Sequence, residues 1–112
     1  TRYRTNFSNT TIKVPYVKTY NQDSLSAFHI LPILLPKNID RNNVMTYLKE
    51  KGIQSSIHYP AFWDFSAYKG NFNKQKNPVA LEIIPQQLTL PLYPTMTFSE
   101  VDKVTNAVLE CI

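Results

Sequence analysis

Apolar residues recur at helical spacing in the middle of the chain. Val44, Tyr47 and Leu48 follow the i, i+3, i+4 pattern of a helix that buries one face. Asp40 stands just before this pattern, where its carboxylate can cap the first turn. Gly52 follows the pattern, as is typical of the residue that ends a helix. The sequence therefore predicts a helix between Asp40 and Gly52.

A second helical pattern occupies the end of the chain. It begins with Thr97-Phe98-Ser99-Glu100, a capping box in which the Thr97 hydroxyl and the Glu100 carboxylate bond each other's backbone amides. Its apolar stripe consists of Val101, Val104, Val108 and Cys111 or Ile112. We interpret Cys111 as a packing residue of this stripe.

Three segments have the patterns of β-strands. Residues 27–35 are apolar on both faces apart from His29, and Pro32, which cannot donate to a ladder, favours an edge or a bulge. Residues 53–59 alternate, with Ile53, Ser55, Ile57 and Tyr59 expected on one face. Residues 88–92 form a short third strand that prolines terminate. We expect all three strands to join one sheet.

A long connection separates the second and third strands. It begins with an aromatic cluster made of Phe62, Trp63, Phe65 and Tyr68. A polar tract follows, and then a short helix opened by Asn77-Pro78 and ended by Pro85. The element order predicts an α+β fold, a small and mostly antiparallel sheet with helices packed on it.

Length and composition limit the chain to one domain. Its 112 residues, 43% of them hydrophobic, can bury one core. Residues 1–25 are expected to be the tail of an entering helix and a connection, and residues 26–112 a small α/β domain. Because the chain opens on Thr1 in mid-pattern, we expect it to be part of a longer protein.

The charge pattern does not favour nucleic-acid binding. The net charge is +4, but the twelve basic residues are dispersed and form no dense run. No apolar run reaches the roughly 18 residues of a membrane span. A single cysteine fits a reducing compartment, and we expect a cytoplasmic protein that binds neither nucleic acid nor membrane.

Few residues in the chain could carry chemistry. His29 and His58 are the two histidines, and neither belongs to a zinc-binding or nucleophile motif. His29, in an apolar strand, is interpreted as a core or interface residue. His58 lies where a strand gives way to the aromatic connection, so a site-lining and a structural role both stay open. Two glycines cannot build a phosphate-binding loop, and we expect no catalytic residue and no metal site.

Several short motifs, taken in order, resemble one family. They are Ser26-Ala27-Phe28-His29, Leu48-Lys49-Glu50-Lys51-Gly52-Ile53-Gln54, Ser56-Ile57-His58-Tyr59-Pro60, Phe65-Ser66-Ala67-Tyr68 and Leu88-Thr89-Leu90-Pro91-Leu92-Tyr93-Pro94. The chain resembles, over nearly its whole length, the C-terminal small domain of the DegT/DnrJ/EryC1/StrS family of sugar aminotransferases that depend on pyridoxal phosphate. The resemblance implies the fold of the C-terminal domain of fold-type I transferases.

The resemblance also implies where the chemistry of such an enzyme lies. The Schiff-base lysine and the cofactor-binding residues belong to a large domain that this chain does not contain. The full-length parent would bind pyridoxal 5'-phosphate, pass an amino group from glutamate to a nucleotide-linked keto-sugar, and form a homodimer. The chain alone is expected to be inactive and without cofactor. Lys13 has a suggestive serine nearby, but we interpret it as a solvated residue of the connection.

Three residues take substrate-binding roles by this resemblance. His58 and Tyr59 match the family's His-Tyr pair at the lip of the active-site cleft, where they would help to bind and orient the sugar. Trp63 stands where members often have a second histidine. An indole stacks on a ring but takes no proton, so this departure bears on sugar specificity. The alternative is a stand-alone α/β protein-interaction module without catalysis.

Overall fold

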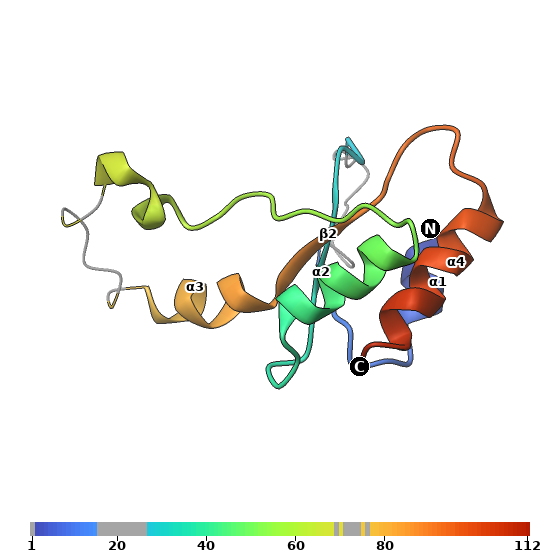
Figure 1. The fold of residues 1–112 in the computed structure, drawn as a ribbon, viewed down its shortest axis with the longest axis horizontal. Helices are drawn as coiled ribbons and strands as arrows, with labels where there is room; N and C mark the ends of the chain where they lie inside the picture. Colours follow the sequence, from blue (N-terminus) through green and yellow to red (C-terminus); the bar gives the residue numbers. More distant parts are fainter. Residues whose placement is uncertain (1, 16–26, 69, 71–74, 76) are drawn as a thin grey trace, which may run out of the picture.

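A computed structural model describes residues 2–15, 27–68, 70, 75 and 77–112 (Figure 1). The α-helices and strands are α1 (Arg2–Phe7), β1 (Leu31–Leu34), α2 (Arg41–Glu50), α3 (Pro78–Ile83), β2 (Gln87–Leu90) and α4 (Phe98–Leu109). Short 3-10 helices are η1 (Phe62–Asp64), η2 (Ser66–Tyr68) and η4 (Ile84–Gln86). The predicted α+β fold is confirmed. None of the helices in these ranges has the length and apolar character needed to cross a membrane.

The two helices predicted from their caps are confirmed. The Asp40 side chain accepts a hydrogen bond of 2.8 Å from the amide of Asn42 at the start of α2. Gly52 follows α2 with a φ of 72°, a left-handed conformation that glycine adopts without strain. At the start of α4, both reciprocal bonds of the Thr97–Glu100 capping box are present. Local chemistry therefore fixes where these helices begin.

The sheet has two antiparallel strands, β1 and β2, with Pro32 opposite Thr89. Thr89 directs both backbone groups away from β1, to Ser56. Pro32 therefore occupies a position of β1 that forms no hydrogen bond with β2, and its backbone nitrogen, which carries no hydrogen, faces away from β2. The predicted edge position of Pro32 is confirmed. Single bridges, Lys13 to Leu34 and Ser56 to Thr89, flank the two strands.

The first predicted strand is shorter than expected. Residues 27–30 are irregular, and β1 begins only at Leu31. Phe28 has a φ of 47°, a left-handed conformation that interrupts extended backbone. His29 is consequently exposed, so of its two interpretations, as a core or an interface residue, the first is wrong and the second stays a prediction. The third strand, β2, ends at Leu90, two residues before the predicted end.

The predicted strand over residues 53–59 is reduced to one bridge at Ser56, and its expected single face is also wrong. Ile53 is 6% exposed whereas Tyr59 is 75% exposed. The ladder to β2 cannot extend toward residue 54 because the facing residue, Pro91, has no N–H and gives its carbonyl to the Tyr3 hydroxyl at 2.9 Å. Toward residue 58, hydrogen bonds from side chains take the place of the next backbone pair of the ladder, His58 with Gln87.

The core lies between the sheet and three helices. Ile33, Leu35, Leu48, Leu88 and Val108 are at most 1% exposed at its centre. The helices α1 and α4 lie side by side, and α2 also packs against α4 (Figure 1). Cys111 packs partly buried against this core, as predicted, and burial is the main reason that the pKa of its thiol is raised.

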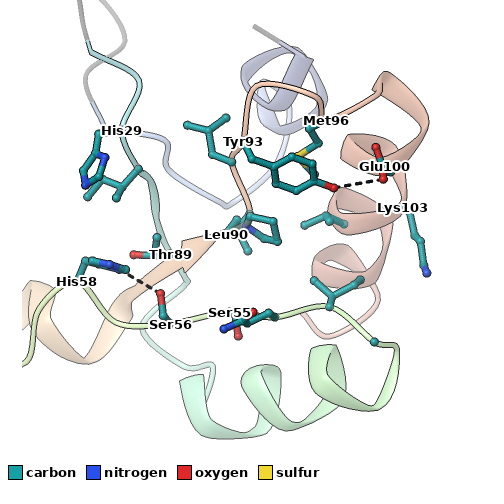
Figure 2. A pocket seen from close by; sticks show the side chains of 17 residues that line it. His29, Ser55, Ser56, His58, Thr89, Leu90, Tyr93, Met96, Glu100 and Lys103 are labelled. Carbon is teal, nitrogen blue, oxygen red and sulfur yellow. Dashed lines mark hydrogen bonds between the residues drawn. The ribbon is translucent and has the colours of Figure 1, made fainter.

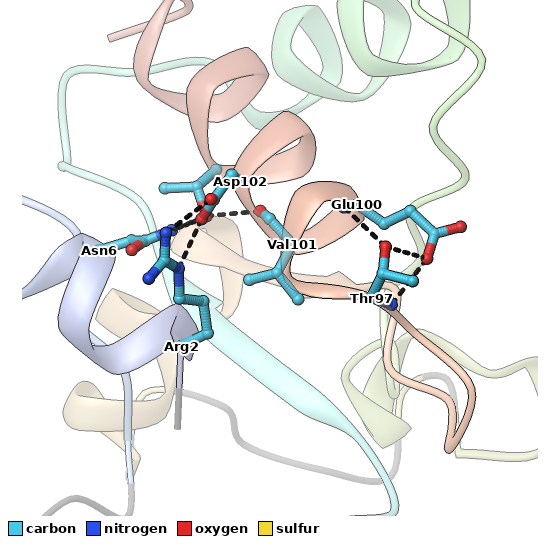
Figure 3. Close-up of polar contacts among 7 residues, drawn as sticks. Arg2, Asn6, Thr97, Glu100, Val101 and Asp102 are labelled. Atoms are coloured by element: carbon cyan, nitrogen blue, oxygen red, sulfur yellow. Dashed lines mark hydrogen bonds and ion pairs between the residues drawn. The ribbon is translucent and has the colours of Figure 1, made fainter.

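The first helix belongs to the same core. Tyr3 and Phe7 of α1 are each 2% exposed, and Ile12 after them is 4% exposed. Arg2 and Asn6 both bond the carboxylate of Asp102 on α4 (Figure 3). The domain boundary expected near residue 25 stays a prediction, but the residues of α1 pack with those after it.

The long connection projects from this body. We call residues 60–68, 70, 75 and 77–86 the arm; they include η1, η2, α3 and η4 and extend to one side in Figure 1. The radius of gyration, 15.5 Å, exceeds the roughly 13 Å of a compact chain of this length. Exposed apolar side chains on the arm are Phe62, Phe65, Tyr68, Val79 and Ile83. The predicted helix opened by Asn77-Pro78 is confirmed as α3.

Candidate functional site

A pocket of about 530 Å³ lies beside the end of β2 (Figure 2). Its walls come from residues 52–58, from Leu90 to Tyr93 after β2, and from the first turns of α4. The bridge between Ser56 and Thr89 holds the first wall against β2. This volume falls within the range of small-molecule sites. The pocket is therefore a candidate for ligand binding in the described part of the chain.

One corner of the pocket is polar. The Nδ1 atom of His58 lies 3.0 Å from the Ser56 hydroxyl, and His29 and Thr89 line the same side (Figure 2). The Thr89 side-chain oxygen is buried and has no hydrogen-bond partner among the described residues. Imidazole and hydroxyl groups donate and accept hydrogen bonds, as sugar hydroxyls require of their partners. This corner could orient a hydroxylated ligand.

The opposite side of the pocket combines apolar and charged groups. Leu90, Pro91, Leu92 and Met96 supply apolar surface. The Tyr93 hydroxyl donates to Glu100 at 3.2 Å, and burial, followed by this carboxylate, raises the pKa of Tyr93. Bonds from the Thr97 amide and hydroxyl lower the pKa of Glu100. Glu100 is thus an anion committed to the helix cap, which makes it a poor proton carrier.

The structure brings together only part of the predicted set of substrate-binding residues. His58 lines the pocket. Tyr59 follows it with ring centroids 5.4 Å apart, but its side chain is mainly exposed and does not line the pocket. Trp63 lies in η1 on the arm, with its ring 5.2 Å from that of Phe62, and also lies outside the pocket. Their substrate-binding roles stay predictions.

Sequence reasoning missed the partners of His58 in the polar corner of the pocket, namely His29, Ser56 and Thr89. The pairing of Leu31 with Leu90 brings the segment before β1 toward the end of β2, and so places His29 at the pocket. Only the register of the sheet gives this proximity. The alternation of residues 53–59 indicated that Ser56 and His58 share a side, which could have pointed to Ser56.

The described residues do not fit pyridoxal phosphate by themselves. Lys103 is the lysine that lines the pocket, and it stands exposed on α4. Glu100, the carboxylate nearby in the sequence, is bonded within its capping box. Lys13 is exposed, as its interpretation as a solvated residue requires, and its backbone forms a bridge to Leu34. In the same ranges, no three His, Cys, Asp or Glu residues gather as a metal site would need.

Related sequences cover nearly the whole chain. The sequence model of the DegT/DnrJ/EryC1/StrS aminotransferase family matches residues 1–109. The uncharacterized protein MJ1066 of Methanocaldococcus jannaschii is 31% identical over 77% of this chain. The dTDP-3-amino-3,6-dideoxy-alpha-D-galactopyranose transaminase of Aneurinibacillus thermoaerophilus is 27% identical over 87% of it. The chain spans about a quarter of these relatives, since the matches cover 24% and 26% of their lengths.

Solved structures show the same fold. The apo-form of the sugar aminotransferase Spr1654 from Streptococcus pneumoniae matches 96% of this chain with a TM-score of 0.83 and 24% identity, over 27% of its own length. PseC of Helicobacter pylori, an aminotransferase involved in the biosynthesis of pseudoaminic acid, matches 98% with a TM-score of 0.81 and 19% identity, over 30% of its length. With the family match over residues 1–109, these findings establish that the chain belongs to the DegT/DnrJ/EryC1/StrS aminotransferase family.

Proposed function

We propose that this chain is the C-terminal small domain of a longer aminotransferase that depends on pyridoxal phosphate. The full-length protein would transfer an amino group from an amino acid, with glutamate as the expected donor, to a nucleotide-linked keto-sugar. One observation carries the proposal: almost the whole chain corresponds to 27% of a sugar aminotransferase, at a TM-score of 0.83. The relative from Aneurinibacillus thermoaerophilus, a transaminase of a dTDP-linked amino sugar, supports the substrate class.

The chain's part in this reaction is to bind and orient the sugar. His58, Tyr59 and Trp63 would contact it, and His58 does so from the polar corner of the pocket. Holding the reacting carbon in one geometry lowers the barrier without any proton transfer by these residues. Pyridoxal phosphate supplies the electron sink when it is bound. Because the described residues do not fit it, the large domain must hold it, and the chain alone would be inactive.

The assembly of the full-length protein is part of the same proposal. We expect a cytoplasmic homodimer in which the large domain covers much of the surface left open here. The second candidate is a stand-alone α/β protein-interaction module without catalysis. The exposed aromatic side chains of the arm are the observation that favours this alternative, since exposed apolar surface can serve as an interaction surface.

The product of the native gene tests the proposal directly. Its intact mass is expected to be several-fold above the 13.0 kDa of this chain. The purified product should show the absorbance of bound pyridoxal phosphate, should lose it on addition of L-glutamate, and should regain it with a nucleotide-linked keto-sugar. A product near 13.0 kDa would favour the interaction module instead.

Isotope-labelled glutamate separates amino transfer from dehydration of the same sugar class. Labelled nitrogen in the sugar product is expected, and a dehydrated sugar without nitrogen would contradict the aminotransferase activity. In the full-length protein, His58→Ala should raise the KM for the sugar nucleotide and leave the cofactor absorbance unchanged. Loss of that absorbance in His58→Ala would contradict a role in sugar binding.

A further inference from the structure

The arm leaves the body and returns to it at two residues that touch. His58 precedes the arm and Gln87, the first residue of β2, follows it. The Gln87 side-chain amide donates from Nε2 to the His58 carbonyl oxygen at 2.5 Å, although the two residues lie 29 positions apart. The side chain of Gln87 therefore joins the two ends of the arm beside the pocket.

This contact stands where a rung of the sheet would otherwise lie. Ser56 and Thr89 exchange both backbone hydrogen bonds, of 3.1 and 2.8 Å. In an antiparallel ladder the next such pair is two residues further on each strand, which is His58 and Gln87. The Gln87 carbonyl instead accepts from Arg41 Nη1 at 3.2 Å. The side chain of Gln87 thus replaces the backbone as the partner of His58.

Arg41 fixes the residue that makes the contact. Its Nη1 atom also donates to the Ile84 carbonyl at 2.6 Å, so α2 holds η4 and the start of β2 together. Gln87 is half-buried and is paired with Leu34 of β1. The backbone of Gln87 is consequently placed by β1 on one side and by Arg41 on the other, so its side chain starts from a fixed point beside His58.

The imidazole of His58 is held at a second point. Its Nδ1 atom lies 3.0 Å from the Ser56 hydroxyl, and the Ser56 backbone is bound to Thr89. Gln87 therefore holds the backbone of His58, and Ser56, whose own backbone is bonded to Thr89 of β2, holds its ring. No hydrogen bond joins the other ring nitrogen, Nε2, to a residue in the described ranges.

We propose that Gln87 is a positioning residue for His58, which it holds at the pocket by bonding the His58 carbonyl in place of a ladder rung. The inference rests on the proposed function, because His58 is the residue that would bind the sugar. Gln87 itself does not line the pocket. A substitution that removes its donor should move the imidazole without removing a group that a ligand touches.

The two histidines of the chain make this displacement measurable without any enzyme activity. In a proton–nitrogen correlation spectrum of the imidazoles, Gln87→Glu should shift the His58 signals, because a carboxylate repels the His58 carbonyl oxygen. The His29 signals should stay unchanged. Gln86→Glu is the matched control, since the neighbouring amide bonds the Glu82 carbonyl at 2.6 Å instead. Unchanged His58 signals in folded Gln87→Glu would overturn the proposal.

A neutral variant covers the case in which Gln87→Glu fails to fold. Gln87→Met removes the donor with similar size and no charge, and it should shift the His58 signals in the same way. Unfolding of both variants, while Gln86→Glu stays folded, would overturn the proposal, because Gln87 would then act on the stability of the whole fold.

Kinetics of the full-length protein give an independent readout. Gln87→Met should raise the KM for the sugar nucleotide about five-fold, in proportion to one neutral hydrogen bond, and leave kcat nearly unchanged. Added to His58→Ala, it should have no further effect, and an additive effect would overturn the proposal. If His58→Ala leaves KM unchanged, the proposed sugar-binding role fails, whereas the imidazole spectrum still tests the hold of Gln87 on His58.

Discussion

The guanidinium of Arg2 meets the carboxylate of Asp102 with two hydrogen bonds, of 2.8 and 2.7 Å, across one hundred residues of sequence (Figure 3). Asn6 donates a third bond to the same carboxylate at 2.7 Å. These contacts join α1 to α4 at the edge of the core. They explain why the first residues pack with the last helix, which no local sequence pattern could indicate.

This ion pair should make stability depend on pH in the acid range. The hydrogen bonds from Arg2 and then Asn6 lower the pKa of Asp102 from 3.8 to about 2. Because the folded-state pKa is the lower one, the carboxylate contributes its full stabilisation above about pH 4 and loses it as the pH falls through about 2. Asp102→Asn should therefore lower the unfolding temperature at neutral pH and flatten its dependence on pH in this window.

Thermal unfolding of single and double variants checks the assignment. Arg2→Gln should reproduce the loss seen in Asp102→Asn, and the double variant should lose less than the two single losses combined. Strictly additive losses, or an unaltered acid dependence in Asp102→Asn, would show that the pair contributes nothing specific to the fold.

The capping box of α4 provides a second prediction. Thr97 Oγ1 accepts from the Glu100 amide at 3.2 Å, and the Glu100 carboxylate accepts from the Thr97 amide at 2.7 Å (Figure 3). Thr97→Ala should cost about 1 kcal/mol in the free energy of unfolding, measured by urea denaturation, because an amide of the first turn loses its partner. Thr97→Ser should retain most of this stability. Ser99→Ala serves as the control, because Ser99 is an exposed residue of the same first turn and takes no part in the capping box.

The helices could be predicted from sequence because their ends are defined by local chemistry. Asp40, Gly52 and Thr97 act on amides or on φ angles within a few residues. The strands depend on partners that the sequence does not identify. Residues 53–59 alternate as a strand should, yet Pro91 blocks the ladder on one side and the Gln87 side chain replaces it on the other. Phe28 shortens β1 because its φ is left-handed, a conformation that the sequence does not predict for phenylalanine.

The residues of the site divide in the same way, into one that its own segment identifies and others that depend on distant partners. His58 was identified because it ends a strand-like pattern and matches a family motif. His29 and Thr89 reach the pocket only through the antiparallel register of β1 and β2, which fixes long-range neighbours. Pattern analysis finds residues that stand out in their own segment, and it misses ordinary ones that pairing brings together.

His29 and Trp63 provide a third prediction, on sugar recognition by the full-length protein. His29 lines the pocket, whereas Trp63 lies on the arm. We expect His29→Ala to raise the KM for the sugar nucleotide several-fold. Trp63→Ala should raise it as well, and Trp63→Phe should restore part of the affinity, because a smaller aromatic face still stacks on a ring. Steady-state kinetics with saturating amino donor measure these effects, and equal KM values for all variants would confine sugar binding to His58 and Tyr59.

The apolar arm provides the last prediction, on the behaviour of the isolated chain. Phe65 is 46% exposed and Val79 is 66% exposed, and the rest of the arm adds further apolar surface. Exposed patches of this kind drive association when nothing covers them. The 112-residue chain should therefore self-associate with rising concentration in sedimentation velocity. The double variant Phe65→Ser/Val79→Ser should shift it toward monomer and reduce the fluorescence of a dye that binds apolar surface. Ile112→Ser is the matched control, since Ile112 is 40% exposed on the body of the fold. If Ile112→Ser has the same effect as the arm variant, association involves the general surface. If only the arm variant changes it, the arm is the surface that the rest of a full-length enzyme, or a partner of a stand-alone module, must cover.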